Sequence, residues 1–165
     1  MIKMNTSNTT TQDDSVKVEQ LLAYLTEELK YESDPIALMA NISAAIMVYI
    51  DRLNWAGFYL VKGEELVLGP FQGLPACSRL QKNKGVCARA WQTAQAVKVD
   101  DVHQFPGHVA CDSASQSELV IPLRYQGEVY AVLDLDSPET SRFTDLEAGF
   151  IQVGEMIEAA LYFER

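Results

Sequence analysis

The sequence has no apolar run near the roughly 20 residues that a membrane-spanning helix needs. Residues 1–12 are polar and lack the apolar core of an export signal, so we expect a cytoplasmic protein with no membrane partner. Basic residues are also scarce: 13 Lys and Arg stand against 23 Asp and Glu, for a formal net charge of -10. Because phosphate binding needs clustered cations, this balance argues against a nucleic-acid partner.

Cysteine and histidine are rare as well, with three and two copies in 165 residues. Three cysteines in a reducing compartment are too few for the disulfide framework of a small secreted protein. They are therefore either buried apolar side chains or groups with redox or metal-binding chemistry. Three cysteines and one histidine could form a zinc site. The C-x2-C spacing usual in structural zinc sites is missing from the sequence, so we expect no metal.

The rest of the composition is that of an ordinary globular domain. Hydrophobic residues make up 48% of the chain, and a length of 165 residues suits one domain with a substantial core. No internal repeat or low-complexity block divides the sequence. We therefore expect a flexible tail over residues 1–12 and a single folded domain over residues 13–165.

Hydrophobic periodicity predicts helices near both ends of the chain and strands between them. One helix should begin at Asp14 and a second should cover residues 36–50, with Asp34 as its N-cap. A short helix is expected over residues 85–92, and a capping box over residues 144–147 should start the last helix. The predicted strands cover 54–62, 65–70, 96–99, 118–125 and 129–135.

The order of these elements indicates the fold class. Consecutive strands joined by tight turns form hairpins, which imply an antiparallel sheet. Helices from the two ends of the chain can cover one face of that sheet, while the long connections cover the other. We predict an α+β domain with a loop-covered, ligand-sized pocket on the face opposite the helices.

The longest connection, residues 100–117, carries Cys111 and both histidines. It is too polar and too rich in Pro, Gly and Ser for a strand, and it has no helical period. Loops of this length in a compact domain are usually functional or disordered. We infer that this loop presents Cys111 as a nucleophile. His103 or His108 could activate it as in a Cys–His hydrolase, but a structural or pocket-rim position is the alternative for both.

Carboxylates form a second candidate group. Asp134 and Asp136 lie two residues apart at the end of a predicted strand, so both point to one face, and Glu118 opens the preceding strand of the same hairpin. Neighbouring acids repel, so at least one should have a raised pKa or bind a cation. The alternative is a strand that runs out into a solvated Asp-Ser-Pro turn.

Aromatic residues and the other two cysteines complete the candidates. Trp55 and Tyr59 share one face of the first strand with Gly57 between them, which should leave a hollow for a thioether or sulfoxide methyl group. Packing in the core is the alternative for such aromatic side chains. Cys77 and Cys87 precede the strand that the Cys111 loop follows, so a disulfide from Cys111 to either of them is geometrically possible.

Five segments of the sequence form a pattern that is much more specific than any one residue. They cover residues 54–60, 68–77, 85–87, 101–115 and 132–138, and the most specific run is Pro-Gly-His-Val-Ala-Cys-Asp-Ser. Together they resemble the free methionine-(R)-sulfoxide reductase family, which is built on a GAF domain. The likeness extends from about residue 35 to 160.

The resemblance implies a GAF-like fold and reduction of free L-methionine-(R)-S-oxide to L-methionine. It implies no metal or organic cofactor, thioredoxin as the reductant, and a homodimer. By position, Cys111 matches the catalytic cysteine, whose sulfenic acid would condense with a second thiol to form a disulfide. Cys77 and Cys87 match the two candidates for that resolving thiol.

The same comparison by position assigns the acids and the aromatic residues. Asp136 and Glu118 match acids that activate the substrate, and Asp134 matches an acid that binds it. Trp55 and Tyr59 match pocket aromatics. A second hypothesis is a GAF module that senses a small ligand and carries out no chemistry.

Overall fold

The structure is a computed structural model, and it describes residues 13–109 and 111–161. The tail expected over residues 1–12 lies outside the described residues. The helices are α1 (Asp14–Tyr31), α2 (Pro35–Tyr49), α3 (Gly85–Thr93) and α4 (Glu147–Ala160), with a short 3-10 helix, η1 (Val102–Gln104). The strands are β1 (Trp55–Lys62), β2 (Glu65–Gly73), β3 (Arg79–Gln81), β4 (Val97–Val99), β5 (Ser117–Tyr125) and β6 (Glu128–Ser137).

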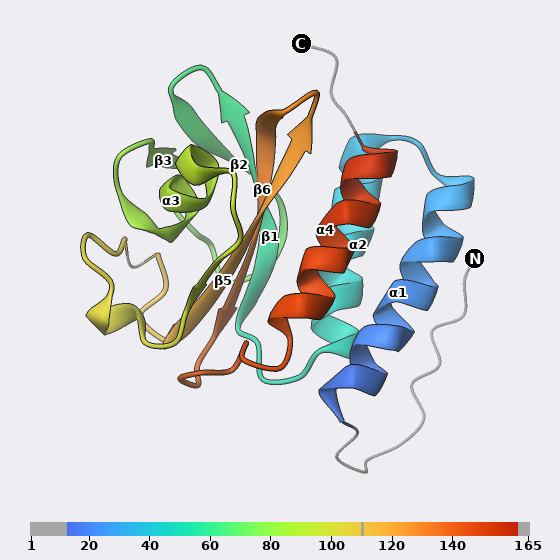
Figure 1. Ribbon diagram of the computed structural model, residues 1–165, viewed down its shortest axis with the longest axis horizontal. Helices are drawn as coiled ribbons and strands as arrows, with labels where there is room; N and C mark the ends of the chain where they lie inside the picture. The colour runs from blue at the N-terminus through green and yellow to red at the C-terminus, as the bar shows by residue number, and fades with distance from the viewer. Residues whose placement is uncertain (1–12, 110, 162–165) are drawn as a thin grey trace.

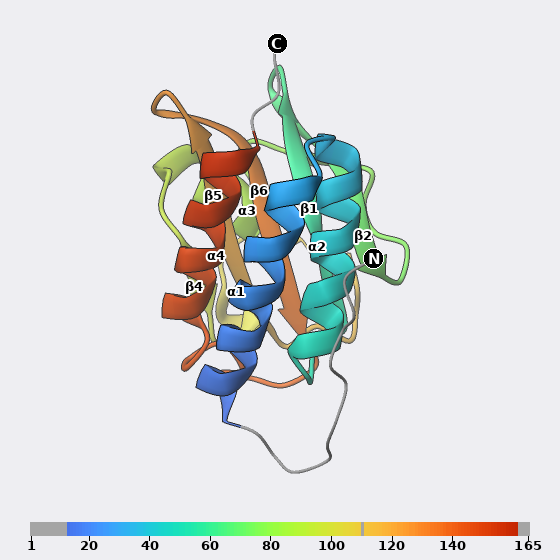
Figure 2. The same ribbon diagram turned by 90° about the vertical axis from the view of Figure 1, so that its right-hand side faces the viewer.

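The strands form one antiparallel sheet in the order β3-β2-β1-β6-β5-β4. Its centre is the pairing of β1 with β6, which joins the hairpin β1–β2 to the hairpin β5–β6. Figure 1 shows α2 and α4 against one face of the sheet, with α1 outside them, and α3 with its flanking loops on the other face. In Figure 2 the three long helices lie side by side in front of the sheet. This confirms the predicted α+β architecture.

Alternation along the central strands divides the buried residues into two groups. Ala56 and Phe58 of β1 and Leu133 of β6 belong to the large core between the sheet and the three long helices. Trp55 and Tyr59 belong to a second cluster on the α3 side. The predicted sharing of one face by Trp55 and Tyr59 is confirmed. Because apolar side chains fill the helix side of the sheet, the α3 side is the face that can carry polar groups.

The predicted start of the second helix is confirmed. The Asp34 carboxylate accepts hydrogen bonds from the backbone N–H groups of Ile36 and Ala37, each at 2.9 Å, and Pro35 is the first helical residue. An aspartate cap satisfies helix donors that have no partner within the helix, and proline has no N–H to satisfy there.

The predicted capping box of the last helix is wrong. α4 begins at Glu147 with Leu146 as its N-cap residue and without a side-chain cap, and the Thr144 hydroxyl donates to the Ser141 carbonyl instead. Phe143 and Leu146 are both fully buried in the large core. Their burial keeps the chain in successive turns up to Leu146, so the helix starts later than the local sequence suggests.

Two strand predictions also need correction. β2 continues to Gly73 instead of ending at Pro70, and the short strand β3 pairs with its first half, where we had expected only a loop. β6 continues through Ser137, so Asp136 lies within the strand and not beyond its end. No helix of the described residues is long and apolar enough to cross a membrane.

Candidate active site

A pocket opens on the α3 face of the sheet. Its floor comes from β1, β5 and β6, and its wall comes from the start of α3 and from the loops on either side of the α3–β4 segment. The pocket is lined by most of the residues singled out from the sequence, namely Trp55, Tyr59, Cys87, Cys111, Glu118, Asp134 and Asp136. The remaining candidate, Cys77, is bonded to Cys111 at the pocket wall.

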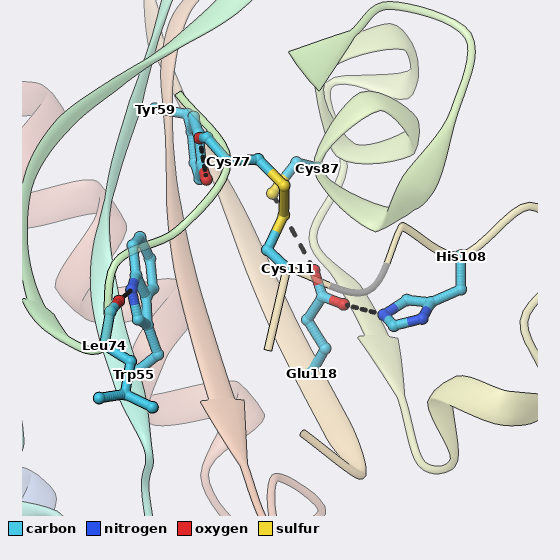
Figure 3. Close-up of a disulfide and its surroundings, with 8 residues drawn as sticks. All are labelled: Trp55, Tyr59, Leu74, Cys77, Cys87, His108, Cys111 and Glu118. Carbon is cyan, nitrogen blue, oxygen red and sulfur yellow. Dashed lines mark hydrogen bonds and ion pairs between the residues drawn. A yellow bond between two sulfur atoms is a disulfide. The ribbon is translucent and has the colours of Figure 1, made fainter. Parts of the chain in front are cut away.

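The disulfide joins Cys77, in the loop between β2 and β3, to Cys111, in the loop between η1 and β5. Their Cα atoms are 5.6 Å apart. Figure 3 shows the bond above the side chain of Glu118. Cys87 is the free cysteine and is buried. Of the two partners that the sequence left open for Cys111, the structure thus brings Cys77 to it.

The acids meet because of the strand register. Asp136 pairs with Trp55 of β1 on one side and with Glu118 of β5 on the other, and Asp134 lies two residues along the same face. Glu118 and Asp134 are 6% and 7% exposed. The solvated-turn alternative for Asp134 and Asp136 is therefore wrong, because both residues lie within β6 and line the pocket.

Burial and mutual repulsion shift the pKa of each of these acids upward. Burial raises the pKa of Glu118 well above its usual value, and the nearby Asp136 adds to the effect. Burial likewise raises the pKa of Asp134, with Glu118 next, and the pKa of Asp136, with Asp134 next. Oδ1 of Asp134 is buried with no hydrogen-bond partner among the described residues. Protonated carboxyls are proton donors, so this cluster can act as a general acid.

The Cys87 thiol belongs to the acid cluster. Its Sγ atom donates to Oε1 of Glu118 at 4.0 Å. Burial raises the pKa of this thiol well above its usual value, with the charges of Asp134 and Glu118 next. Because the thiolate is the reactive form of cysteine, this environment makes Cys87 a poor nucleophile.

The zinc site considered from the sequence is not assembled, because Cys77 and Cys111 are bonded to each other. In the described part of the chain, one group of three possible metal-binding side chains has its ligand atoms within 4.8 Å of one another: Cys87, Glu118 and Asp134. Metal ligands must be deprotonated. Burial raises the pKa of all three groups, so each holds its proton to a higher pH than an exposed group of its kind.

The two aromatic residues connect the sheet to the Cys77 loop. Nε1 of Trp55 donates to the Leu74 carbonyl at 3.2 Å, and the Tyr59 hydroxyl donates to the Cys77 carbonyl at 2.9 Å. The two rings stack on each other with their centroids 5.9 Å apart. Figure 3 shows the two hydrogen bonds, from Trp55 to Leu74 and from Tyr59 to Cys77, as dashed lines. Trp55 and Tyr59 therefore line the pocket and also fix the backbone that carries Cys77.

The hollow predicted beside Gly57 is absent from the described structure. A side-chain carbon at Gly57 would lie 2.7 Å from the Trp55 ring and closer still to Phe71. The Trp55 ring also stacks on Phe71, with centroids 5.3 Å apart. Gly57 thus permits close packing of two aromatic side chains, and the free space of the pocket lies instead toward Cys111 and the acids.

The two histidines have different environments. The exposed His103 ring has Nδ1 3.0 Å from the Asp101 carboxylate, which also accepts from the His103 N–H and caps η1. The His108 ring is only 15% exposed and lines the pocket, with Nε2 3.4 Å from Oε2 of Glu118. The pocket-rim alternative therefore holds for His108, while His103 is a turn residue.

Asn54 is a site residue whose role the sequence analysis missed. Its Nδ2 donates to Oδ2 of Asp112 at 2.9 Å and to Oγ of Ser115 at 3.1 Å. These bonds join the start of β1 to the loop that carries Cys111. Asn54 precedes Trp55 in one of the family-like segments, but its partners lie about 60 residues away, and sequence spacing gives no sign of such a contact.

The chain is similar in sequence to proteins that are already known. The GAF domain family matches residues 36–160. The free methionine-R-sulfoxide reductase of Escherichia coli is 45% identical over 131 residues, which cover 79% of this chain and 79% of that protein.

Two solved structures have the same fold. The free methionine-R-sulfoxide reductase from Neisseria meningitidis, in complex with its substrate, has a TM-score of 0.88 and 34% identity, over 95% of each chain. The fRMsr of Staphylococcus aureus, in its reduced form, has a TM-score of 0.81 and 39% identity, over 96% of this chain and 100% of that one. The likeness thus covers the whole described domain, pocket included.

Proposed function

The chain belongs to the GAF-domain family of free methionine-R-sulfoxide reductases, and we propose that it reduces free methionine-R-sulfoxide to methionine with two of its cysteines. One observation carries the proposal: a bond between Cys77 and Cys111 beside a pocket that is lined by three carboxyl groups. A reactive sulfur and a supply of protons are the two things that removal of a sulfoxide oxygen requires. The names of the relatives support the choice of substrate.

The first step uses the Cys111 thiolate as nucleophile and one of the acids as proton donor. The Cys111 thiolate attacks the sulfur of the sulfoxide, and Glu118 or Asp136 donates a proton to the oxygen as the bond from substrate sulfur to oxygen breaks. Two electrons pass from Cys111 to the substrate sulfur. The oxygen is transferred to the Cys111 sulfur as the bonds from the substrate sulfur to oxygen and to Cys111 break, so methionine leaves and Cys111 holds a sulfenic acid. The raised pKa of the two acids supports this role, because a proton donor must still hold its proton near neutral pH.

The second step restores the cysteine. The Cys77 thiol attacks the Cys111 sulfenic sulfur, water leaves and the disulfide forms. An external dithiol, for which we propose thioredoxin, then reduces the disulfide and is itself oxidised. Cys77 fits the resolving role because it lies next to Cys111, whereas Cys87 is buried and hydrogen-bonded to Glu118.

The charges of the pocket suit a free amino acid. Oδ1 of Asp134, which has no partner among the described residues, can accept a hydrogen bond from the substrate ammonium group, and the charge of that group favours the carboxylate form of Asp134. Lys84, just before α3, brings a positive charge to the pocket wall and suits the substrate carboxylate. A homodimer in the cytoplasm completes the proposal, as the resemblance implies.

A turnover assay tests this function. Protein incubated with free methionine-R-sulfoxide and a dithiol should release methionine, and Cys111→Ser should abolish the release. A GAF sensor would instead bind a ligand without consuming it, and no feature of the described structure favours that alternative over the reductase. Absence of turnover in the wild-type protein, or full turnover in Cys111→Ser, would refute the proposal.

A further inference from the structure

His108 connects the buried acid cluster to the surface of the protein. Its ring is 15% exposed, while the Glu118 side chain that it contacts is almost completely buried. Figure 3 shows the imidazole reaching Glu118 from the loop that also carries Cys111. The other carboxylate oxygen of Glu118 faces the Cys87 thiol. The imidazole therefore contacts the carboxylate oxygen of Glu118 that does not face Cys87.

The two groups are matched for sharing a proton. Burial raises the pKa of Glu118 and lowers the pKa of His108, so the two values move toward each other. These two shifts move the balance from the ionised pair, a carboxylate beside an imidazolium, toward the neutral pair, a carboxylic acid beside an imidazole. Protons bound to two interacting groups belong to the pair and not to either member, so one proton can be shared between the two side chains.

The proposed reaction requires a route by which Glu118 regains the proton that it donates. Ionisation of the Cys111 thiol releases one proton, and the sulfoxide oxygen takes one from the acid cluster, so the proton balance of the step is zero. A buried Glu118 that has donated its proton is left as a carboxylate, which is costly away from water. It must regain a proton before the next cycle.

We propose that His108 is a positioning residue that shares a proton with Glu118 and carries protons between this acid and solvent. The proposal deepens the function proposed above and rests on it. The imidazole takes a proton from water on its exposed side and passes one to Glu118 through Nε2. His108 thereby keeps Glu118 in the protonated form that the first step uses.

Other ionisable groups lie near the pair of His108 and Glu118, and their charges also affect its titration. The described residues that line the pocket include Lys84, Asp112, Asp134 and Asp136, and the Cys87 thiol packs against Glu118 from α3. Of the described ionisable groups, Glu118 is the one paired with the His108 ring.

A titration followed by NMR tests the shared proton without turnover. The chain has two histidines, so its spectrum has two sets of imidazole signals, and the exposed His103 is an internal control. If the proton is shared, Glu118→Gln lowers the His108 midpoint by about one pH unit, the low end of the shift that a neighbouring opposite charge produces. The His103 midpoint stays where it is. Identical His108 curves in the two proteins would overturn the proposal.

Kinetics test the transfer itself. His108→Gln should lower kcat about 100-fold, in the range of general acid–base contributions, with an unchanged KM for the sulfoxide and partial recovery on adding free imidazole. His103→Gln should leave kcat unchanged. A purely structural role of His108 would give a loss that imidazole does not restore, and that result, or an unchanged kcat, would contradict the proposal. An inactive wild-type protein would refute the proposed function instead, while the NMR result would still decide the proton pair.

Discussion

The three cysteine side chains differ in what surrounds each sulfur. Cys77 and Cys111 meet across two loops at the edge of the pocket, and Cys87 lies below them in contact with Glu118. A reductant in solution can therefore reach Cys77 and Cys111 more readily than the buried Cys87. Proximity in space, and not spacing in the sequence, decides which thiol resolves the sulfenic acid.

Substitution of the two candidate resolving cysteines should therefore have different effects. Cys87→Ser keeps a hydroxyl donor toward Glu118, and we expect its turnover with thioredoxin to stay within about threefold of wild type, a difference of well under 1 kcal/mol. Cys77→Ser should form one methionine per chain and then stop, because the sulfenic acid has no partner. Quantification of methionine against time distinguishes the two. The reverse pattern would make Cys87 the resolving thiol.

The acids should give the reaction a descending limb at high pH. Because burial raises the pKa of Asp136, its carboxyl stays protonated through the range where an exposed aspartate ionises, and it loses its proton only at higher pH. The rate of the first step should therefore fall as pH rises through that raised value. Asp136→Asn should lower this rate about 100-fold, as measured by rapid-quench analysis of the pre-reduced protein.

Asp100→Asn is the matched control for that substitution, since Asp100 is exposed and its carboxylate pairs with Lys98. We expect it to retain the wild-type rate at every pH. An Asp136→Asn protein with wild-type kinetics would remove this acid from the mechanism.

At the scale of elements, the pocket depends on how two loops are fixed to the sheet. The indole N–H of Trp55 and the hydroxyl of Tyr59 fix the Cys77 loop. The side chain of Asn54 fixes the Cys111 loop. All three residues lie at or just before β1, the strand paired with β6 at the centre of the sheet. One rigid strand thus sets the relative position of the two reactive sulfurs.

Loss of the Asn54 contacts should loosen the Cys111 loop. Asn54→Ala removes two side-chain hydrogen bonds, and we expect it to lower the free energy of unfolding by about 1–3 kcal/mol. We also expect slower disulfide formation after oxidation. Asn83→Ala, at an exposed position near α3, is the control and should change neither quantity. Unchanged disulfide kinetics in Asn54→Ala would show that the loop is held by other contacts.

The sequence predicted the elements where a local pattern decides the structure. Alternation along β1 placed Trp55 and Tyr59 on one face, and the same rule placed the two aspartates of β6 on one face. The Asp34 cap was also correct. The short strand β3 was missed because pairing with β2, and not its own composition, holds it in the sheet.

Errors occurred where packing between distant segments decides the structure. The space beside Gly57 is taken by Phe71 from the neighbouring strand, and the start of α4 is set by core burial before the helix. The pairing of Cys111 with Cys77 depends on the path of two loops. The residue types of the site were recognisable in the sequence, whereas these partners become visible only in the folded chain.

At the scale of the whole molecule, one ion-pair network holds the outer helix to the rest of the domain. The Arg142 guanidinium, 2% exposed in its side chain, donates to both carboxylate oxygens of Asp14 in α1, at 2.7 and 2.9 Å, and to Asp51 at 2.9 Å. None of these three residues lines the pocket of the described structure. The network therefore serves stability and not catalysis.

Arg142→Met should destabilise the fold by about 3–5 kcal/mol, because it leaves the partially buried Asp14 without its main partner. The matched control is Arg79→Met, which breaks an exposed pair with Glu65 and should cost less than about 1 kcal/mol. Urea unfolding of both variants gives the comparison. Equal effects of the two substitutions would show that the Arg142 network contributes no more than a surface pair.

The most direct test of the central claim is a single turnover without reductant. Fully reduced protein is mixed with excess free methionine-R-sulfoxide, methionine is quantified, and the disulfide is mapped by mass spectrometry. We predict one methionine per chain, a bond between Cys77 and Cys111, and Cys87 as a free thiol. Absence of methionine, or a disulfide between Cys77 and Cys87 that excludes Cys111, would contradict the account.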